Sequence, residues 1–214
     1  MWDWQRDGPL DGRWAGLMLD RSDSSLEKRP SRALEFFRGF LRSPDKVGSV
    51  IPSSRFLERR LVGSAEIGRA RTVVELGPGT GGTTRALLAA MRPDARLLTI
   101  ELDPRFAELL SEIDDPRLVS HTGSAADLGD ILRLHGLPAP DAIVSGIPFS
   151  TMPRPIGQAV LEAVRDQLGP GGVFVAYQFR GHVGRMGEPI LGPPRIEFEP
   201  LNVPPMRFFR WTRP

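Results

Sequence analysis

Short apolar runs and longer helical stretches alternate along the sequence from residue 71 to residue 179. The apolar runs are rich in β-branched residues, as buried strands are, and a segment with helical periodicity follows each of the first four. The predicted strands are 71–76, 96–102, 117–122, 142–147 and 172–179, and the predicted helices between them are 80–91, 104–113, 125–134 and 155–168. This alternation predicts a parallel sheet with helices on both faces and ligand sites at the carboxyl ends of the strands.

The ends of the chain add to this pattern. Residues 195–199 and 207–212 are two further strand candidates, close enough to pair as an antiparallel hairpin. With 214 residues, 40% of them hydrophobic, the chain can bury one sizeable core. The expected organisation is a poorly ordered tail over 1–27, a helical segment over 28–62, and an α/β domain over 63–214.

Basic side chains are concentrated before the predicted domain. Residues 28–60 carry nine Lys or Arg against three Asp or Glu, a net of +6, whereas the whole chain has +2. Residues 30–42 have helical periodicity with an apolar and a charged face. The apolar face includes Phe36, Phe37 and Phe40, and the charged face includes Arg38 and Arg42. Such a helix either packs on the core or lies on an anionic membrane surface, and any anionic partner is expected to meet residues 28–60.

Ser53 or Ser54 is suited to cap a second short helix through Val62. Three of the four Trp lie in the tail, which either anchors at a membrane interface or folds back on the domain. No stretch approaches the roughly 18 apolar residues of a membrane span, and the polar beginning is unlike a signal peptide, so a cytoplasmic protein is expected. The chain has no Cys, and its three His lack the spacing of metal-binding pairs, so no metal is expected.

A glycine-rich segment, residues 73–82 with the sequence VVELGPGTGG, follows the first predicted strand and opens a helix. Its glycines allow a sharp turn and a close approach of the backbone to a ligand. Gly77, Gly79 and Gly82 satisfy the spacing of a dinucleotide-binding loop, so a dehydrogenase is one interpretation. Glu75 argues against it, because a carboxylate before the first glycine would crowd a pyrophosphate but can hold an ammonium group.

The run 73–81 resembles motif I of class I S-adenosylmethionine-dependent methyltransferases. Glu101, nineteen residues past the last glycine, falls at the acid that binds the ribose in that family. Ser124 departs from the Asp that the family commonly has beside the adenine. The resemblance implies a Rossmann-like α/β fold, with a seven-stranded, mainly parallel sheet that ends in a reversed C-terminal hairpin, and S-adenosylmethionine as cofactor. The residues expected to bind it are Glu75, Gly77, Gly79, Thr80, Gly81, Glu101, Leu102, Ser124, Ala125 and Ser145.

The fourth predicted strand runs into Ser145-Gly146-Ile147-Pro148-Phe149, where the methyl acceptor lies in this family. Ribosomal RNA adenine dimethyltransferases are similar here, but their motif begins with Asn or Asp where this chain has Gly146. An adenine amine is a poor nucleophile and needs that acceptor group. An aliphatic amine needs less help, since positioning can supply most of the catalysis.

Three segments, 37–57, 144–153 and 171–180, resemble bacterial phospholipid N-methyltransferases, and the likeness runs from about residue 30 to the end of the chain. It implies methyl transfer to the headgroup amine of phosphatidylethanolamine, up to three times toward phosphatidylcholine. It also implies a peripheral enzyme on the cytoplasmic face of the membrane, docked on anionic lipid by the N-terminal helix. The residues expected at the substrate are Gly146, Ile147, Pro148, Tyr177 and Arg180.

Tyr177, the only Tyr, is the expected catalytic residue, with its ring or hydroxyl beside the cationic centres, or else an ordinary buried aromatic. Arg180 could take the lipid phosphate. Two alternatives remain. One is an rRNA adenine-N6 methyltransferase that uses the basic segment on phosphates, and the other is a cofactor-binding module without catalysis. Gly146 argues against the first, and no stable nucleic-acid partner is expected.

Overall fold

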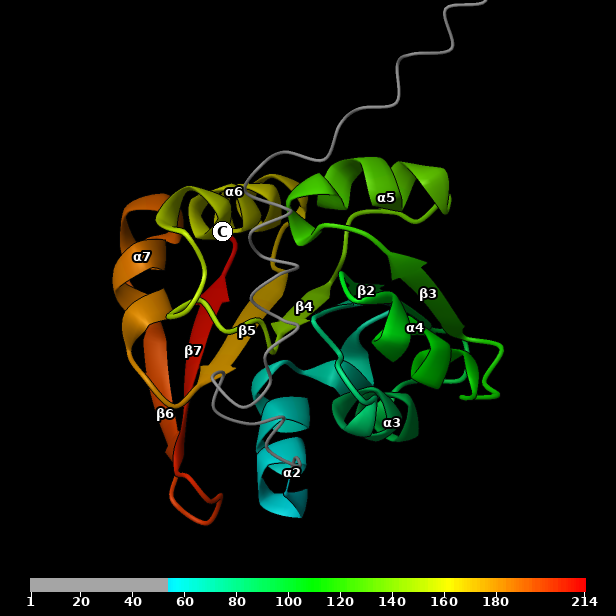
Figure 1. Ribbon diagram of the computed structural model, residues 1–214, viewed down its shortest axis with the longest axis horizontal. Helices are drawn as coiled ribbons and strands as arrows, with labels where there is room; N and C mark the ends of the chain where they lie inside the picture. The colour runs from blue at the N-terminus through cyan, green and yellow to red at the C-terminus, as the bar shows by residue number, and fades with distance from the viewer. Residues whose placement is uncertain (1–53) are drawn as a thin grey trace, which may run out of the picture. The chain divides into compact units, whose positions relative to one another are not determined.

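The strands of the computed structural model, which describes residues 54–214, form one seven-stranded sheet (Figure 1). They are β1 Thr72–Leu76, β2 Arg96–Glu101, β3 Leu118–Thr122, β4 Ala142–Ser145, β5 Val173–Gln178, β6 Arg195–Glu199 and β7 Met206–Thr212. The order across the sheet is β3-β2-β1-β4-β5-β7-β6. Strands β1 to β5 are parallel, and β7 runs antiparallel to both β5 and β6. The predicted Rossmann-like sheet with a reversed hairpin is confirmed.

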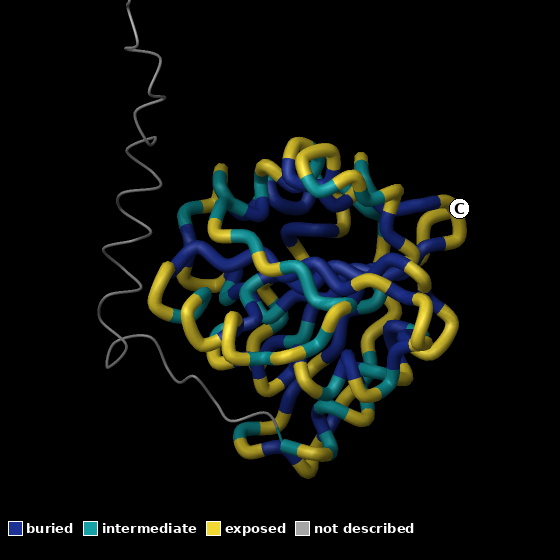
Figure 2. The backbone as a smooth tube through the Cα atoms, turned by 90° about the vertical axis from the view of Figure 1, so that its right-hand side faces the viewer, coloured by how far each residue is buried: buried dark blue, intermediate teal, exposed yellow. Residues whose placement is uncertain are grey.

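Helices cover both faces of this sheet, as predicted. They are α2 Arg55–Ser64, α3 Gly82–Ala90, α4 Pro104–Ser111, α5 Leu128–Leu134, α6 Arg154–Gln167 and α7 His182–Leu191. One buried cluster joins α2 and α3 to the sheet, and a second joins α5, α6 and α7 to the opposite face. In Figure 2 the buried backbone runs through the middle of the molecule, and exposed segments lie outside it.

Strand β1 is buried along its whole length because helices cover it on both sides. Val73 belongs to the cluster on the α2 and α3 face, and its neighbour Val74 belongs to the cluster on the other face. A strand of this kind reads as a continuous apolar run rather than an alternating one. Glu75 is the one charged residue in this strand, and it is fully buried. Because burying a carboxyl group costs free energy, its presence here indicates a functional role.

Helix α2 begins where the sequence predicts a cap. The Ser54 hydroxyl accepts a 3.2 Å hydrogen bond from the Leu57 amide, and the helix ends at Ser64, slightly beyond the predicted Val62. Leu57 and Leu61, four residues apart, are buried. The predicted tail, the amphipathic helix and its residues Phe36, Phe37, Phe40, Arg38 and Arg42 lie outside the described residues.

Helix α7 was not predicted, because its sequence contains residues that usually interrupt helices. Gly184 and Gly187 lie on the buried side, and Pro189 lies in the last turn. Both glycines have a packing reason. A Cβ atom on Gly184 would lie 2.7 Å from the Phe209 ring, and one on Gly187 would lie 2.8 Å from the Trp211 ring. The helix therefore approaches β7 more closely than any side chain at these positions would allow.

Candidate active site

The turns that follow the central strands are tied together by backbone hydrogen bonds at the carboxyl edge of the sheet. The Gly77 amide donates to the Ile100 carbonyl oxygen at 3.0 Å, and the Gly146 amide donates to the Leu76 oxygen at 3.0 Å. The Gly123 amide donates to the Glu101 oxygen at 2.9 Å. The predicted cofactor and acceptor segments are therefore adjacent, at the edge where a parallel sheet binds its ligands.

The glycine loop needs glycine at three positions. Gly77, Gly79 and Gly81 all have positive φ angles, of 71°, 57° and 81°. A Cβ atom on Gly77 would also lie 3.0 Å from the Ile147 side chain, so this glycine lets β1 and the acceptor segment approach each other. A Cβ atom on Gly79 would meet nothing within 4 Å, which leaves open space beside the loop. Helix α3 starts at Gly82, not Thr80 as predicted, because Gly81 still has the left-handed conformation.

Glu75 projects from β1 toward the first turn of α3. Its Oε2 atom accepts a 2.6 Å hydrogen bond from the Thr84 hydroxyl, while its Oε1 atom is buried and has no hydrogen-bond partner in the described part of the chain. Burial raises the pKa of this carboxyl, the Thr84 bond opposes the rise and the charge of Glu101 adds to it, so that the pKa is about 8. A buried carboxyl with an unused oxygen fits an ammonium group, such as that of S-adenosylmethionine.

Glu101 is bound mainly by backbone amides. Its Oε1 atom accepts hydrogen bonds from Leu102 and Asp103 at 2.8 and 3.0 Å, and its Oε2 atom accepts one from Gly79 at 3.1 Å. Burial raises the pKa of this carboxyl, and the three amides oppose the rise. Because a carboxylate oxygen can accept more than one hydrogen bond, Oε2 keeps capacity for a ribose hydroxyl. The bond to Gly79 also fixes the glycine loop relative to β2, an effect that the sequence did not predict.

Tyr177 and Gly146 are in contact across β5 and β4. The Tyr177 hydroxyl lies 3.3 Å from the Thr83 hydroxyl. A Cβ atom on Gly146 would lie 2.5 Å from the Tyr177 hydroxyl oxygen and 3.0 Å from the Gly77 carbonyl oxygen. Residue 146 must therefore be glycine while Tyr177 keeps this position. Burial raises the pKa of the Tyr177 phenol, and the charge of Glu75 raises it further, so the hydroxyl stays protonated at neutral pH.

The first turn of α3 contacts both halves of the site. Thr84 binds the buried acid of the glycine loop, and the adjacent Thr83 lies beside the Tyr177 hydroxyl. The sequence did not predict a role for either threonine, because a helical pattern does not show which site residues their hydroxyl groups contact. It also missed Gln178, whose side-chain amide donates a 2.6 Å hydrogen bond to the Ile147 carbonyl oxygen and so holds the acceptor segment against β5.

The remaining predicted residues divide between the interior and the surface. Ser145 is buried and its hydroxyl accepts a 3.3 Å hydrogen bond from the Ile147 amide. The Ser124 hydroxyl accepts one from the Ala126 amide at 3.2 Å, so it caps a short helix. The other predicted cofactor and substrate residues differ in how far they are exposed to solvent. Leu102, Ala125 and Ile147 are buried, Pro148 is half-buried, and Thr80 and Arg180 are exposed.

Comparison with known proteins identifies the family. No family model matches the sequence. An ornithine lipid N-methyltransferase of Singulisphaera acidiphila is 32% identical over 177 residues, which cover 79% of this chain and 90% of the relative. This chain belongs to that family. A ribosomal RNA small subunit methyltransferase A of Phenylobacterium zucineum is 36% identical over 96 residues, but that match spans only 32% of the relative.

Solved structures agree on the fold. The O-methyltransferase TomG of Streptomyces achromogenes, in complex with S-adenosylmethionine, superposes with a TM-score of 0.62 at 19% identity, covering 89% of this chain and 94% of that one. The N-methyltransferase NodS of Bradyrhizobium japonicum gives 0.61 at 16% identity, covering 76% and 97%. This family member is a class I methyltransferase with S-adenosylmethionine as its methyl donor, and the unused Glu75 oxygen beside the open glycine loop fits that cofactor.

Proposed function

We propose that this enzyme transfers methyl groups from S-adenosylmethionine to the primary amine of a membrane-lipid headgroup. The contact between Tyr177 and Gly146 is the observation that carries the proposal. It puts a phenol where an RNA adenine methyltransferase needs an Asn or Asp side chain, and it leaves no room for such a side chain. The relative's name supplies one candidate lipid, ornithine lipid, and the sequence resemblance supplies a second, phosphatidylethanolamine. Both offer an aliphatic amine.

The cofactor supplies an electrophilic methyl group on a positively charged sulfur atom. In our proposal the Glu75 carboxylate holds its ammonium group, and Glu101 accepts hydrogen bonds from its ribose. The positive φ angles of Gly77 and Gly79 keep the loop backbone close to it. These contacts would hold the cofactor at the carboxyl edge of the sheet, beside the acceptor segment.

The acceptor amine reacts in its neutral form, because only that form has a free electron pair. With the cofactor bound, the amine nitrogen would form a bond to the methyl carbon as the carbon–sulfur bond breaks, and the proton lost from nitrogen would pass to water. Tyr177 orients the amine through its protonated hydroxyl or the face of its ring, which also stabilises neighbouring positive charge. Arg180, exposed beyond β5, is suited to a headgroup anion.

Attachment to an anionic membrane belongs to this proposal. In residues 54–214 no helix has the length and apolar character required to cross a bilayer. The proposed docking residues in the N-terminal segment are Phe36, Phe37, Phe40, Arg38 and Arg42. Of the predicted basic segment, Arg60 is committed to an ion pair with Glu199 at 2.8 Å, so it is not available to a phosphate.

A methyl-transfer assay with radiolabelled cofactor tests the function. The acceptors are anionic vesicles that contain phosphatidylethanolamine, ornithine lipid or neither, and ribosomal RNA is the fourth. We expect label in at least one amine-containing vesicle and none in RNA, and the two lipid arms identify the headgroup. The Glu75→Gln variant controls for cofactor-dependent transfer. Label in RNA alone, or in no acceptor, would contradict the proposal.

A further inference from the structure

Strand β6 directs its charged side chains toward the protein and its apolar side chains toward solvent, the reverse of what is usual for a strand at a sheet edge. Arg195, Glu197 and Glu199 point toward α2, where the two glutamates are covered and Arg195 stays exposed at the rim, and Ile196 and Phe198 point away. The exposed fractions of Ile196 and Phe198 are 58% and 51%. An antiparallel edge strand usually has its apolar side chains toward the core and its charged ones in water. The reversal here implies that the outer side of β6 has a partner.

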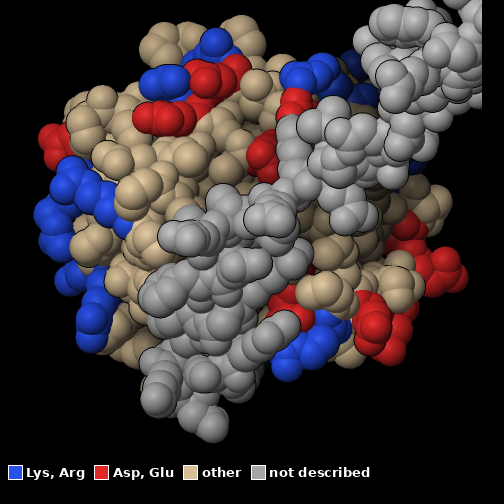
Figure 3. Space-filling model, turned by 45° about the horizontal axis from the view of Figure 1, so that its top comes forward, with Lys and Arg blue, Asp and Glu red and all other residues tan. Residues whose placement is uncertain are grey.

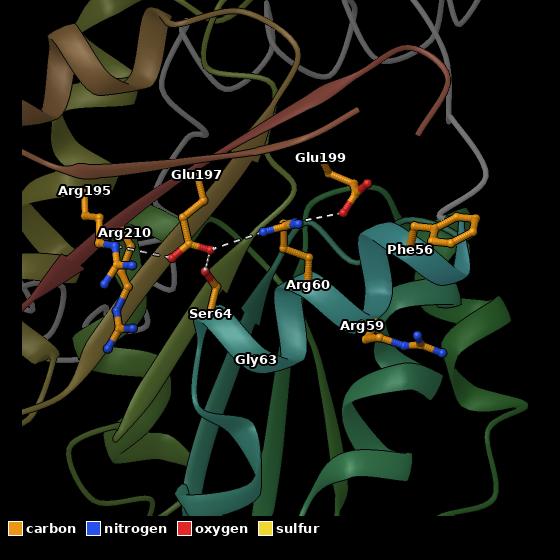
Figure 4. Close-up of a pocket in the computed structure, with 9 residues that line it drawn as sticks. All are labelled: Phe56, Arg59, Arg60, Gly63, Ser64, Arg195, Glu197, Glu199 and Arg210. Atoms are coloured by element: carbon orange, nitrogen blue, oxygen red, sulfur yellow. Dashed lines mark hydrogen bonds and ion pairs between the residues drawn. The ribbon is translucent and has the colours of Figure 1, made fainter. Parts of the chain in front are cut away.

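Ion pairs hold β6 in this orientation. Arg60 of α2 donates to Glu199 at 2.8 Å and lies 3.9 Å from Glu197, and the Ser64 hydroxyl donates to Glu197 at 2.7 Å (Figure 4). These groups line a pocket of about 390 Å³ between α2 and the hairpin. Because the pocket's acids are paired with its arginines, we assign it to fixing the hairpin and not to catalysis.

The exposed apolar residues gather at this end of the sheet. Seven large hydrophobic side chains are strongly exposed in the described part of the chain, and five of them form what we call the hairpin surface. These are Phe179, Ile196, Phe198, Leu201 and Val203. Leu201 and Val203, in the turn between β6 and β7, are 61% and 87% exposed. Single exposed apolar residues need no explanation, but a cluster at one edge marks an interaction site.

The hairpin surface lies at the edge of the sheet that holds the candidate active site. Arg207 of β7 pairs in register with Gln178 of β5 on one side and with Phe198 of β6 on the other. Gln178 in turn binds the acceptor segment through the Ile147 oxygen. The turn between β6 and β7 follows directly, so its apolar side chains flank the site rather than the opposite edge.

Charge distribution favours an anionic partner. Residues 180–214 hold six Arg and three Glu. Glu197 and Glu199 are paired with arginine, and Arg195 and Arg210 are paired with glutamate, so the other four Arg and one Glu keep the stretch positive. Residues 101–141 hold nine acidic residues and three Arg. In Figure 3 basic side chains gather along the side that carries α7 and β6. Exposed Arg180 and Arg207 stand beside Phe179 and Phe198, the combination of cation and apolar side chain that binds an anionic bilayer surface.

We propose that the hairpin surface is a membrane-docking element, which inserts Leu201 and Val203 between lipid headgroups and so brings the active-site edge onto the bilayer. The turn suits insertion, because the Leu201 amide donates to Glu199 at 3.0 Å and the Asn202 side chain donates to the Pro204 oxygen at 2.8 Å. Such internal bonds lower the cost of leaving water. This docking role depends on the proposed function in one respect, namely that docking at the hairpin surface would present a lipid amine to Tyr177.

Site-specific fluorescence tests insertion directly. The chain has no Cys, so Leu201→Cys and Val203→Cys each provide a single labelling site in the full-length protein. An environment-sensitive label at either position should shift to shorter wavelength with vesicles of equal phosphatidylglycerol and phosphatidylcholine, and respond weakly to phosphatidylcholine alone. Leu134→Cys, at an equally exposed apolar position on α5, is the control and should not respond. A label at 201 and 203 that is unchanged on bound enzyme, or already shielded before vesicles are added, would overturn the proposal.

A paired substitution tests the consequence. The double variant Leu201→Glu with Val203→Glu should bind anionic vesicles at least about tenfold more weakly, because two apolar side chains are lost from the interface. Leu134→Glu should leave binding unchanged. With a dispersed short-chain lipid amine as acceptor, the double variant should keep wild-type turnover, which separates docking from catalysis. Equal vesicle binding by both proteins would refute the docking role and leave methyl transfer intact. Failure of the proposed function would instead abolish transfer while leaving the label response.

Discussion

The Thr84 hydroxyl donates a 2.6 Å hydrogen bond to one carboxyl oxygen of Glu75, while the second, equally buried oxygen has no partner in residues 54–214. Without a cation, this environment favours the neutral acid, and the pKa of Glu75 rises to about 8. An ammonium group favours the ionised form. The same residue therefore links the stability of the cofactor-free protein to the binding of the cofactor.

Glu75→Gln should stabilise the cofactor-free protein at pH 8 to 9 and weaken cofactor binding. A folded-state pKa of about 8 lies above the ordinary value of 4.5, so the stability due to the neutral acid is complete below pH 4.5 and is lost as pH rises through 8. Glutamine keeps an acceptor for Thr84 and does not ionise. Thermal unfolding across pH 5 to 9 should give a flatter profile for the variant. Calorimetry should give binding weaker by about 1–3 kcal/mol.

Proton release provides the control for this linkage. At pH 7 the wild type should release close to one proton when S-adenosylmethionine binds, because Glu75 must ionise to pair with the ammonium group. Calorimetry in two buffers of different ionisation enthalpy measures this number. The Glu75→Gln variant should release fewer protons. Equal release by both proteins would mean that another group carries the linkage.

Gly146→Ala should lower turnover more than cofactor affinity, because its Cβ atom would displace the Tyr177 hydroxyl that lies 2.5 Å away. Overpacking of this kind costs about 1–3 kcal/mol of stability. Tyr177→Phe removes the nearest atom but keeps the ring, so adding it to Gly146→Ala should restore part of the stability and none of the turnover. A double-mutant cycle on unfolding free energy and on kcat checks both. Additive effects on stability would show that the two residues do not touch.

Gly184→Ala and Gly187→Ala should each lower the unfolding free energy by roughly 1–3 kcal/mol, since a methyl group would meet the Phe209 or Trp211 ring at under 3 Å. Gly63→Ala, in α2, is the matched control. No atom lies within 4 Å of its added Cβ, so helix propensity predicts a gain of about 0.5–1 kcal/mol. Chemical denaturation measures all three. A loss at Gly63 as large as at the other two would contradict the packing explanation.

Arg60→Met should loosen the hairpin without changing cofactor affinity. Its contact with Glu199 holds the pKa of that carboxyl below its ordinary value, so the pair stabilises the fold above that value and loses its effect as pH falls through the lowered pKa. Arg60 is partly exposed, so we expect about 1 kcal/mol or less. A double-mutant cycle with Glu199→Gln on the unfolding free energy should give a coupling at pH 7 that weakens as pH falls through the lowered pKa of Glu199.

His121 should titrate below pH 6.5. Burial lowers its pKa, the charge of His135 lowers it further, and Asp127 opposes the change. The His121 Nδ1 atom lies 3.1 Å from the His135 Nε2 atom, so two protonated rings would repel. Because the folded protein resists protonation here, its stability should fall as pH drops below 6.5. Nuclear magnetic resonance titration of the ring protons checks the pKa, and a His121 value above 6.5 would contradict this explanation.

The sheet and the glycine loop were predictable because local patterns determine them. β-branched runs and positive-φ glycines at 77, 79 and 81 depend on neighbouring residues alone. The contact between Tyr177 and Gly146 depends instead on the register between β4 and β5. Ser145 pairs with Ala176, so the residues that follow them, Gly146 and Tyr177, lie opposite each other, and a register shift of one residue would separate them. Helix α7 was missed for a related reason, because its glycines are explained only by the rings of β7.

The hairpin strands were predicted, but their faces were not. The sequence RIEFE alternates as a strand should, and the usual reading would turn Ile196 and Phe198 inward. Their actual direction follows from Arg60 and Ser64, which lie more than 130 residues earlier in the chain. Long-range ion pairs of this kind leave no local trace in the sequence, whereas the amide-bound Glu101 at a strand end could be found from its spacing alone.

Strand β6 is also the last strand of the sheet, so within residues 54–214 its outer backbone has no strand beside it. An open edge of this kind can recruit a strand from another molecule and start polymerisation. Here the strand is five residues long, Pro193 and Pro194 precede it, and Pro200 follows it. Proline lacks the amide that an added strand would need, so the edge is too short and too interrupted to template a fibril. Many copies of such a protein can therefore gather at high density on a two-dimensional surface without polymerising through their β6 edges.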